Sequence, residues 1–220
     1  MDGFLVINKP KTWTSFDVVA KVRNTLQIKK VGHTGTLDPL ATGVLVLCLG
    51  KATKKVEEIT GLEKEYVAEI TLGITSNTDD AEGELEKNES AQPIERQVID
   101  SLLEKFQGEI QQVPPQFSAK QINGQRAYKL ARKGREVKLE PRTVTVHELE
   151  ILDYSWPILK LRILCGKGTY IRSIARDIGK ELGCGAYMSE LERTKVGNFT
   201  LADAITIEEV TEERIRGIGV

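Results

Sequence analysis

The sequence has little that could hold a metal ion or form a disulfide framework. Its two histidines, His33 and His147, are too few for most histidine-based metal sites. Its three cysteines, Cys48, Cys165 and Cys184, lie far apart and without Cys-x-x-Cys spacing. Such an odd, scattered set is typical of reduced thiols in the cytoplasm. We therefore expect no metal, no disulfide and a cytoplasmic protein.

Long hydrophobic segments are also absent. The longest apolar run covers residues 44–49, whereas a membrane-spanning helix needs roughly 18 apolar residues in a row. Residues 1–10 lack the basic start and long apolar stretch of a secretory signal peptide. We expect no membrane association. The 40% of hydrophobic residues still suffices for a core, because a chain of this length buries about 70% of its unfolded surface.

The sequence also does not match the common motifs for binding nucleotide cofactors or calcium. Around residues 43–51 six residues separate two glycines where a phosphate-binding loop has four, and Ala52 replaces the Ser or Thr that binds magnesium. The glycine-rich turn at 166–170 lacks the third glycine of a dinucleotide fingerprint. The acidic loop at 78–89 begins with threonine where a calcium loop has aspartate. We expect no cofactor.

The net charge of −1 conceals a strong pattern along the chain. Residues 9–55 carry nine basic and two acidic groups, while residues 56–112 carry four basic and fifteen acidic groups. Residues 113–147 and 160–196 are basic again, with net charges of +6 and +4. A polyanion responds to the local face of a protein, so these blocks are compatible with nucleic-acid binding. They are equally compatible with an ordinary solvated surface.

Hydrophobic periodicity predicts an α+β protein without internal repeats. We expect one domain with a basic insertion at about residues 113–142, where a short helix is possible around 126–132. A helix N-capped by Ser15 is predicted to run to about residue 28. A second helix with a Thr169 cap is predicted to end at Gly183. The other predicted elements are strands at 4–10, 44–50, 66–73, 143–152 and 158–165, and helices at 94–107 and 207–215.

Three residues could carry chemistry, each with an ordinary structural alternative. Asp38 precedes Pro39 and is therefore biased to an extended or turn conformation, which can project its carboxylate from a rigid loop or merely organise an Asx turn. Tyr66 lies on the core face of its predicted strand, where a phenol can be catalytic or structural. Arg172 lies in the first turn of its helix, where a cation opposes the helix dipole. That position indicates an anionic partner, unless the arginine is simply exposed.

Six segments, taken in order along the chain, form a distinctive set. They are FLVINKPKTWTS (4–15), GHTGTLDPLATGVL (32–45), KEYVAEITLG (64–73), VPPQFSAKQINGQRAYKLARKG (113–134), GTYIRSIARDIG (168–179) and GCGAYMSELERTKVGNF (183–199). Together they resemble the TruB family of tRNA pseudouridine synthases. The resemblance spans nearly the whole chain and implies the pseudouridine synthase fold, a mixed, mostly antiparallel sheet flanked by helices, with an RNA-clasping insertion at about 113–142.

The resemblance also implies roles for single residues. Asp38 matches the catalytic aspartate, acting as a nucleophile at the sugar or base or as a base assisting elimination from C2′; the sequence does not choose between these. Arg172 matches the arginine expected to pair with that carboxylate, and Tyr66 the tyrosine expected to pack on the target ring. The implied substrate-binding residues are His33, Lys64, Tyr170 and Leu191. His33 is expected to fill the stack that a flipped nucleotide leaves.

The implied activity is isomerisation of uridine to pseudouridine in the T loop (TΨC, position 55) of tRNA. It needs no cofactor, because the bond broken and the bond made belong to one nucleotide. We expect a monomer that binds the tRNA T arm. Most bacterial relatives continue into a C-terminal PUA domain, whereas this chain stops at Val220. We therefore expect one catalytic domain over residues 1–220 and no PUA domain.

Three alternatives differ from this interpretation. A guide-RNA-dependent pseudouridine synthase has the same fold but needs partner-binding surfaces outside these segments. A non-catalytic RNA-binding or tRNA-folding protein has no need for Asp38, Tyr66 and Arg172 together. A glycosidase-like hydrolase would ordinarily need a second catalytic carboxylate, and none lies in the matched motifs.

Overall fold

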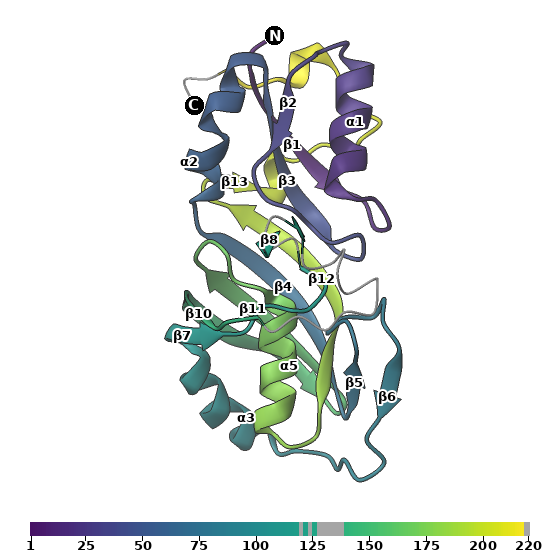
Figure 1. Cartoon of the computed structure of the whole chain (residues 1–220), viewed down its shortest axis with the longest axis vertical. Helices are drawn as coiled ribbons and strands as arrows, with labels where there is room; N and C mark the ends of the chain where they lie inside the picture. The colour runs from purple at the N-terminus through teal and green to yellow at the C-terminus, as the bar shows by residue number, and fades with distance from the viewer. Residues whose placement is uncertain (119–120, 123–124, 127–138, 218–220) are drawn as a thin grey trace. The chain divides into compact units, whose positions relative to one another are not determined.

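A computed structural model describes residues 1–118, 121–122, 125–126 and 139–217. The chain divides into two compact units, drawn in Figure 1. Unit 1 comprises Met1–Val67 and Leu191–Val220, and unit 2 comprises Ala68–Glu190. The division falls inside two strands, β4 (Lys64–Leu72) and β12 (Ala186–Val196).

Unit 1 is built around a sheet with the strand order β1–β3–β12. Strand β1 (Gly3–Lys9) pairs antiparallel with β3 (Thr42–Leu49), and β12 runs parallel to β3. The short strands β2 (Val31–His33) and β13 (Phe199–Thr200) pair with β3 and β12. The remaining elements are α1 (Ser15–Thr25), η1 (Gly50–Lys55), α2 (Val56–Thr60), η3 (Leu201–Asp203) and η4 (Glu212–Arg214).

The core of unit 1 covers both faces of this sheet. On one face, Val18 and Val22 of α1 pack in a cluster with Leu45 and Leu47 of β3. On the other face, Val44 and Val46 belong to a second cluster, which includes residues of η1 and α2. Successive side chains of a strand point to opposite faces, so a strand buried on both sides reads as an uninterrupted apolar run. The predicted strands at 4–10 and 44–50 are confirmed.

Two predicted details of unit 1 are wrong. The N-cap of α1 is Thr14 and not Ser15, because Thr14 and Asp17 form a capping box in which each side chain accepts a hydrogen bond from the other's backbone N–H. No α-helix forms at 207–215, where the structure has only the 3₁₀ turn η4. Directly after this segment, the backbone of Arg216 forms an isolated bridge with Phe4 of β1.

Unit 2 contains a sheet with the strand order β4–β11–β10–β7, in which β10 pairs antiparallel with β11 and with β7. Its strands beyond β4 are β7 (Gly108–Gln112), β10 (Arg142–Ser155) and β11 (Ile158–Cys165). Strands β5 (Ile74–Ser76) and β6 (Leu85–Lys87) form a separate hairpin, as do β8 (Gln121–Ile122) and β9 (Gln125–Arg126). Among the described residues of this unit, the helices are α3 (Arg96–Leu103), which continues into η2 (Glu104–Phe106), and α5 (Ile171–Glu181).

The sequence pattern of unit 2 correctly located its two longer helices and three of its long strands. The strands at 66–73, 143–152 and 158–165 and the helices at 94–107 and 169–183 are confirmed, with shifted ends. The buried stripe of α5 contains Ile171, Ile174, Ala175 and Ile178, the spacing of one helical face. Strands β7 and β12 and the hairpins β5–β6 and β8–β9 were not predicted. The possible helix around 126–132 and most of the 113–142 insertion lie outside the described residues.

The fold class is confirmed as α+β with a mixed, mostly antiparallel sheet. The division into two compact units does not decide whether they act as one catalytic domain. The single domain over residues 1–220 therefore stays a prediction.

Candidate active site

The candidate catalytic carboxylate, Asp38, lies in the loop that joins β2 to β3 in unit 1 and is half-buried. The hydroxyl of Ser15, at the start of α1, accepts a hydrogen bond from the Leu37 N–H (2.8 Å) and donates one to the Leu37 carbonyl (3.1 Å). The backbone carbonyl of Asp38 accepts from the Ala41 N–H (3.1 Å). The residue before Asp38 is therefore held by a side chain from another element.

Two fully buried cations bind backbone carbonyls around the same loop. The Lys9 ammonium donates to the carbonyl of Pro39 (3.3 Å), directly after Asp38, and also to the carbonyl of Trp13 (2.6 Å). The Arg193 guanidinium donates to the carbonyls of Val44 (2.7 Å) and Gly35 (3.1 Å). A buried charge is costly unless it is hydrogen-bonded, so each cation stabilises one backbone path of the loop.

Glycine is required where β3 meets β12. Gly43 has φ +100°, and a Cβ atom there would lie 2.2 Å from the Arg193 carbonyl oxygen. Any other residue would push the strands apart or strain the backbone. The close approach keeps the β12 backbone, and with it the Arg193 side chain, next to the loop.

The other expected site residues of unit 1 are largely enclosed. His33 is half-buried at the end of β2, and its Nδ1 accepts from the Gly35 N–H (3.3 Å). Lys64 is buried and donates to the carbonyls of Thr60 and Leu62, at the C-terminal end of α2 (2.9 and 2.6 Å). That end of a helix is where a cation is favoured. These bonds support a structural role for Lys64 beside the expected substrate-binding role.

Tyr66 and Leu191 are both buried in unit 1. Tyr66 shares the buried face of β4 with Ala68 and Ile70, as the strand pattern predicted. Leu191 begins the part of β12 that belongs to unit 1. Asp38, His33, Lys64, Tyr66 and Leu191 therefore all belong to unit 1, whereas Arg172 and Tyr170 belong to unit 2.

Arg172 is the second residue of α5 and is buried, so the alternative of an exposed surface arginine is wrong. Its guanidinium forms an ion pair with Asp80 (3.3 Å), and the two side chains are 5% and 3% exposed. The same guanidinium donates to the carbonyls of Thr78 and Phe117 (both 3.2 Å). The position of Arg172 in the first turn of its helix predicted an anionic partner. Within unit 2 that partner is the carboxylate of Asp80.

Asp80 was missed by sequence reasoning. It was one of fifteen acids in residues 56–112, and nothing in the local spacing distinguishes it. Its carboxylate also accepts from the Thr78 hydroxyl (2.6 Å) and the Glu82 N–H (3.0 Å). These bonds fix the orientation of the Asp80 carboxylate toward Arg172. The acidic loop at 78–89, which lacks the pattern of a calcium site, therefore holds a carboxylate against an arginine.

The neighbouring residue, Asp79, forms a second ion pair one turn further along α5. Its carboxylate binds Arg176 (3.0 Å), which also donates to the Val113 carbonyl (2.9 Å). Burial raises the pKa of the Asp79 carboxyl above its ordinary value, and Arg176 and Arg172 lower it only in part. Its backbone has φ +63°, a conformation that aspartate and asparagine tolerate better than most residues.

The raised pKa of Asp79 predicts a pH-dependent effect of Asp79→Asn. A group whose pKa is higher in the folded protein than in the unfolded chain contributes stability at low pH, and that contribution is lost as pH rises through the folded pKa. The melting temperature of Asp79→Asn, relative to wild type, should therefore increase between pH 3.5 and pH 7. Thermal unfolding across this range measures the difference. A relative melting temperature that falls with pH would contradict the direction of the shift.

Tyr170 precedes α5 as its N-cap and has no side-chain capping bond. The buried Gln112 amide accepts from the Tyr170 N–H (2.8 Å) and donates to the Tyr170 carbonyl (3.0 Å). The predicted Thr169 cap is wrong, because the Thr169 hydroxyl donates to the Gly166 carbonyl and closes the preceding turn. The Arg142 guanidinium lies over the Tyr170 ring, 4.7 Å from its centroid. One aromatic face of this expected substrate-binding residue is thus covered.

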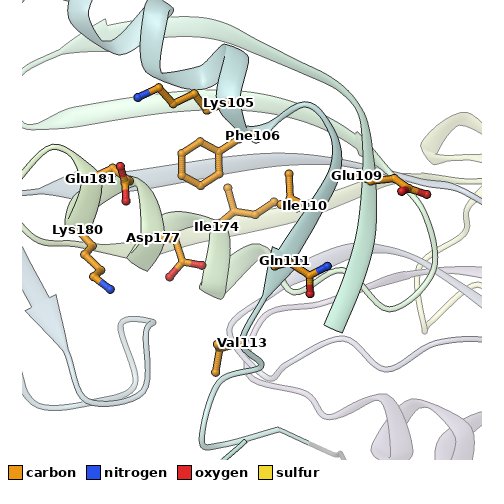
Figure 2. A pocket seen from close by; sticks show the side chains of 10 residues that line it. All are labelled: Lys105, Phe106, Glu109, Ile110, Gln111, Val113, Ile174, Asp177, Lys180 and Glu181. Carbon is orange, nitrogen blue, oxygen red and sulfur yellow. The ribbon is translucent and has the colours of Figure 1, made fainter. Parts of the chain in front are cut away.

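Unit 2 contains a cavity of about 440 Å³ (Figure 2). Its apolar part is formed by Phe106, Ile110 and Ile174, with charged side chains of both signs around them. None of the expected site residues lines it. Among the described residues no group of three or more His, Cys, Asp or Glu side chains could hold a metal ion. No described helix has the length and apolar content to cross a membrane.

Comparison with known proteins decides the family. Residues 23–171 match the family model described as TruB family pseudouridylate synthase (N terminal domain). The chain belongs to the TruB family. Residues 172–216 match the model of the tRNA pseudouridylate synthase B C-terminal domain. The resemblance inferred from the sequence motifs is therefore confirmed.

Curated members of the TruB family align with nearly the whole chain. The chain is 49% identical over 214 residues to tRNA pseudouridine synthase B of Parabacteroides distasonis, covering 94% of this chain and 91% of that protein. It is 48% identical over 216 residues to tRNA pseudouridine synthase B of Clostridium tetani, covering 98% and 75%.

Solved structures with similar folds include longer chains. A chain in a Cbf5-Nop10-Gar1 complex aligns with a TM-score of 0.75 and 34% identity, covering 94% of this chain and 53% of that one. A chain in an H/ACA RNP bound to a substrate RNA containing 2'-deoxyuridine aligns with a TM-score of 0.71 and 32% identity, covering 94% and 51%. The present chain therefore spans about half the length of each of these two chains.

Proposed function

We propose that this TruB family member isomerises uridine to pseudouridine in tRNA, at the uridine of the T loop. The observation that carries the proposal is Asp38, a carboxylate in the GHTGTLDP segment whose neighbouring residues, Leu37 and Pro39, are bound by Ser15 and Lys9. Rigid presentation of one carboxylate suits a reaction that needs a single positioned group. Relatives that align over nearly the whole chain are named tRNA pseudouridine synthase B.

The reaction rearranges one nucleotide without any external reactant. The bond between N1 and C1′ breaks, the uracil turns, C5 joins C1′, and the proton on C5 is released while N1 gains one. Asp38 acts either as a nucleophile at the sugar or base, or as a base that removes a proton from C2′. Both routes begin with an ionised carboxylate. Tyr66 is proposed to pack on the target ring and to carry the proton from C5.

Arg172 is proposed to stabilise the ionised form of Asp38, since a nearby cation favours a charged carboxylate. The contacts of Arg172 with Asp80, Thr78 and Phe117 hold the guanidinium in one orientation. Its pairing with Asp38 stays a prediction.

The substrate is proposed to bind as a flipped-out nucleotide of the tRNA T arm. Extrusion of a base costs a few kcal/mol, and His33 is proposed to offset part of this cost by filling the vacated stack. Leu191, Lys64 and Tyr170 are proposed to contribute to substrate binding. The basic blocks at 9–55, 113–147 and 160–196 would contact phosphates, and the protein is proposed to act as a monomer without metal or cofactor.

Release of tritium from tRNA labelled at C5 of uridine tests the function. An unmodified transcript should lose the label of one uridine, and a transcript with cytidine at the T-loop position should lose none. Release at other uridines would contradict the proposed position but not the chemistry. No release from free tRNA would contradict the proposal. Release only with added guide RNA would favour the guide-dependent alternative, and salt-sensitive binding alone would favour a non-catalytic RNA-binding protein.

A further inference from the structure

The Ser15 hydroxyl makes two bonds to a single residue 22 positions away. It accepts from the Leu37 N–H at 2.8 Å and donates to the Leu37 carbonyl at 3.1 Å, and Ser15 is only 2% exposed. A serine hydroxyl has one proton to donate and lone pairs to accept, so this pair of bonds occupies its donor and one acceptor site. The Leu37 side chain is also buried. Both backbone groups of Leu37 are therefore tied to the start of α1.

These bonds act directly on the backbone of Asp38. The Leu37 carbonyl belongs to the same planar peptide unit as the Asp38 N–H, so a bond to that carbonyl sets the orientation of the plane that enters Asp38. On the other side, Pro39 restricts Asp38 to extended conformations, and its carbonyl accepts from Thr12 N–H (2.8 Å) and Lys9 (3.3 Å). The backbone of Asp38 is thus held before and after the residue.

The hydroxyl of Ser15 is not needed to cap the helix. Thr14 performs that function through its capping box with Asp17. Two adjacent hydroxyl residues therefore have separate partners: Thr14 satisfies the first turn of α1, and Ser15 binds the loop that carries Asp38.

We propose that Ser15 is a positioning residue that orients the Asp38 carboxylate for catalysis. The inference rests on the proposed function of Asp38 and deepens it. A displacement of about 1 Å at a reacting group costs on the order of 10²-fold in rate. Loss of the hydroxyl frees the Leu37–Asp38 peptide to rotate, so the rate of isomerisation falls while the surface that binds tRNA stays in place.

Two variants, Ser15→Ala and Thr14→Ala, separate a positioning role of the hydroxyl from a role in stability. For each variant, the single-turnover rate of tritium release, the tRNA affinity and the melting temperature are measured. Ser15→Ala should react about 10- to 100-fold more slowly, with its tRNA dissociation constant within about twofold of wild type. Thr14→Ala is the matched control, because it removes the neighbouring hydroxyl and the helix cap. It should melt several degrees lower but react at the wild-type rate.

A third variant keeps the test decisive if Ser15→Ala does not fold. Ser15→Cys is nearly isosteric and retains only a weak donor and acceptor, so its rate should lie between those of Ser15→Ala and wild type. A wild-type rate in Ser15→Cys or Ser15→Ala would overturn the inference. Equal rate losses in Ser15→Ala and Thr14→Ala would do the same. Absence of tritium release from wild-type protein would instead contradict the proposed function itself.

Discussion

Asp38→Asn should abolish isomerisation while leaving tRNA binding almost unchanged. The amide has nearly the same shape as the carboxylate, so the loop bonds of Ser15 and Lys9 to the neighbouring residues persist. It can act neither as a nucleophile nor as a base, and both proposed routes need one of these. Removing such a group lowers a rate by a factor on the order of 10⁴ or more. Tritium release and a tRNA-binding titration on the same preparation measure the two effects.

The control for this substitution is Asp17→Asn. Asp17 is an exposed carboxylate in the same unit, and its role is to complete the capping box of α1. Asp17→Asn should reduce the melting temperature slightly and leave the rate unchanged. Loss of a catalytic group leaves a residual rate far below about one per cent of the wild-type rate. If Asp38→Asn kept more than that, Asp38 would not be the catalytic carboxylate.

Arg172→Met should cost both activity and stability. It leaves Asp80 as a buried carboxylate without its cation, and it removes the donors to the Thr78 and Phe117 carbonyls. Removing one partner of a buried ion pair reduces the free energy of unfolding by about 3–5 kcal/mol. Adding Asp80→Asn removes the uncompensated charge. The double variant should therefore recover part of the lost stability but none of the activity, as thermal or denaturant unfolding and tritium release would show.

Arg176→Met is the matched control on the same helix. Its guanidinium is 30% exposed and binds Asp79 and Asp177, whose carboxylates are also partly accessible. The loss of stability should be smaller than that of Arg172→Met, since water reaches the carboxylates left behind. A double variant Arg172→Met/Asp80→Asn that is less stable than Arg172→Met alone would show that Asp80 is stabilised mainly by Thr78 and Glu82.

Local patterns in the sequence were sufficient for the three longest helices and for most of the long strands, but not for β12 or the short elements. The apolar run of β3 favoured a strand because it is short and rich in valine, and the buried residues Ile171, Ile174 and Ile178 have the spacing of one helical face. The pattern was less informative at the ends of elements. The adjacent hydroxyls Thr14 and Ser15 are both good caps by residue type, and the capping-box spacing of Thr14 and Asp17, which the structure confirms, distinguishes them.

The sequence by itself determined the fold class, the TruB family and the identity of Asp38 as the candidate carboxylate, because local periodicity and contiguous motifs carry that information. Only the tertiary structure showed that Ser15 binds Leu37, that Arg172 pairs with Asp80, and that Lys9 and Arg193 bind loop carbonyls. Arg172 and its acceptor Thr78, for example, are 94 positions apart. Apart from the Arg172–Asp80 ion pair, these bonds join side chains to backbone groups that every residue possesses, so no local pattern distinguishes the partner until the chain has folded.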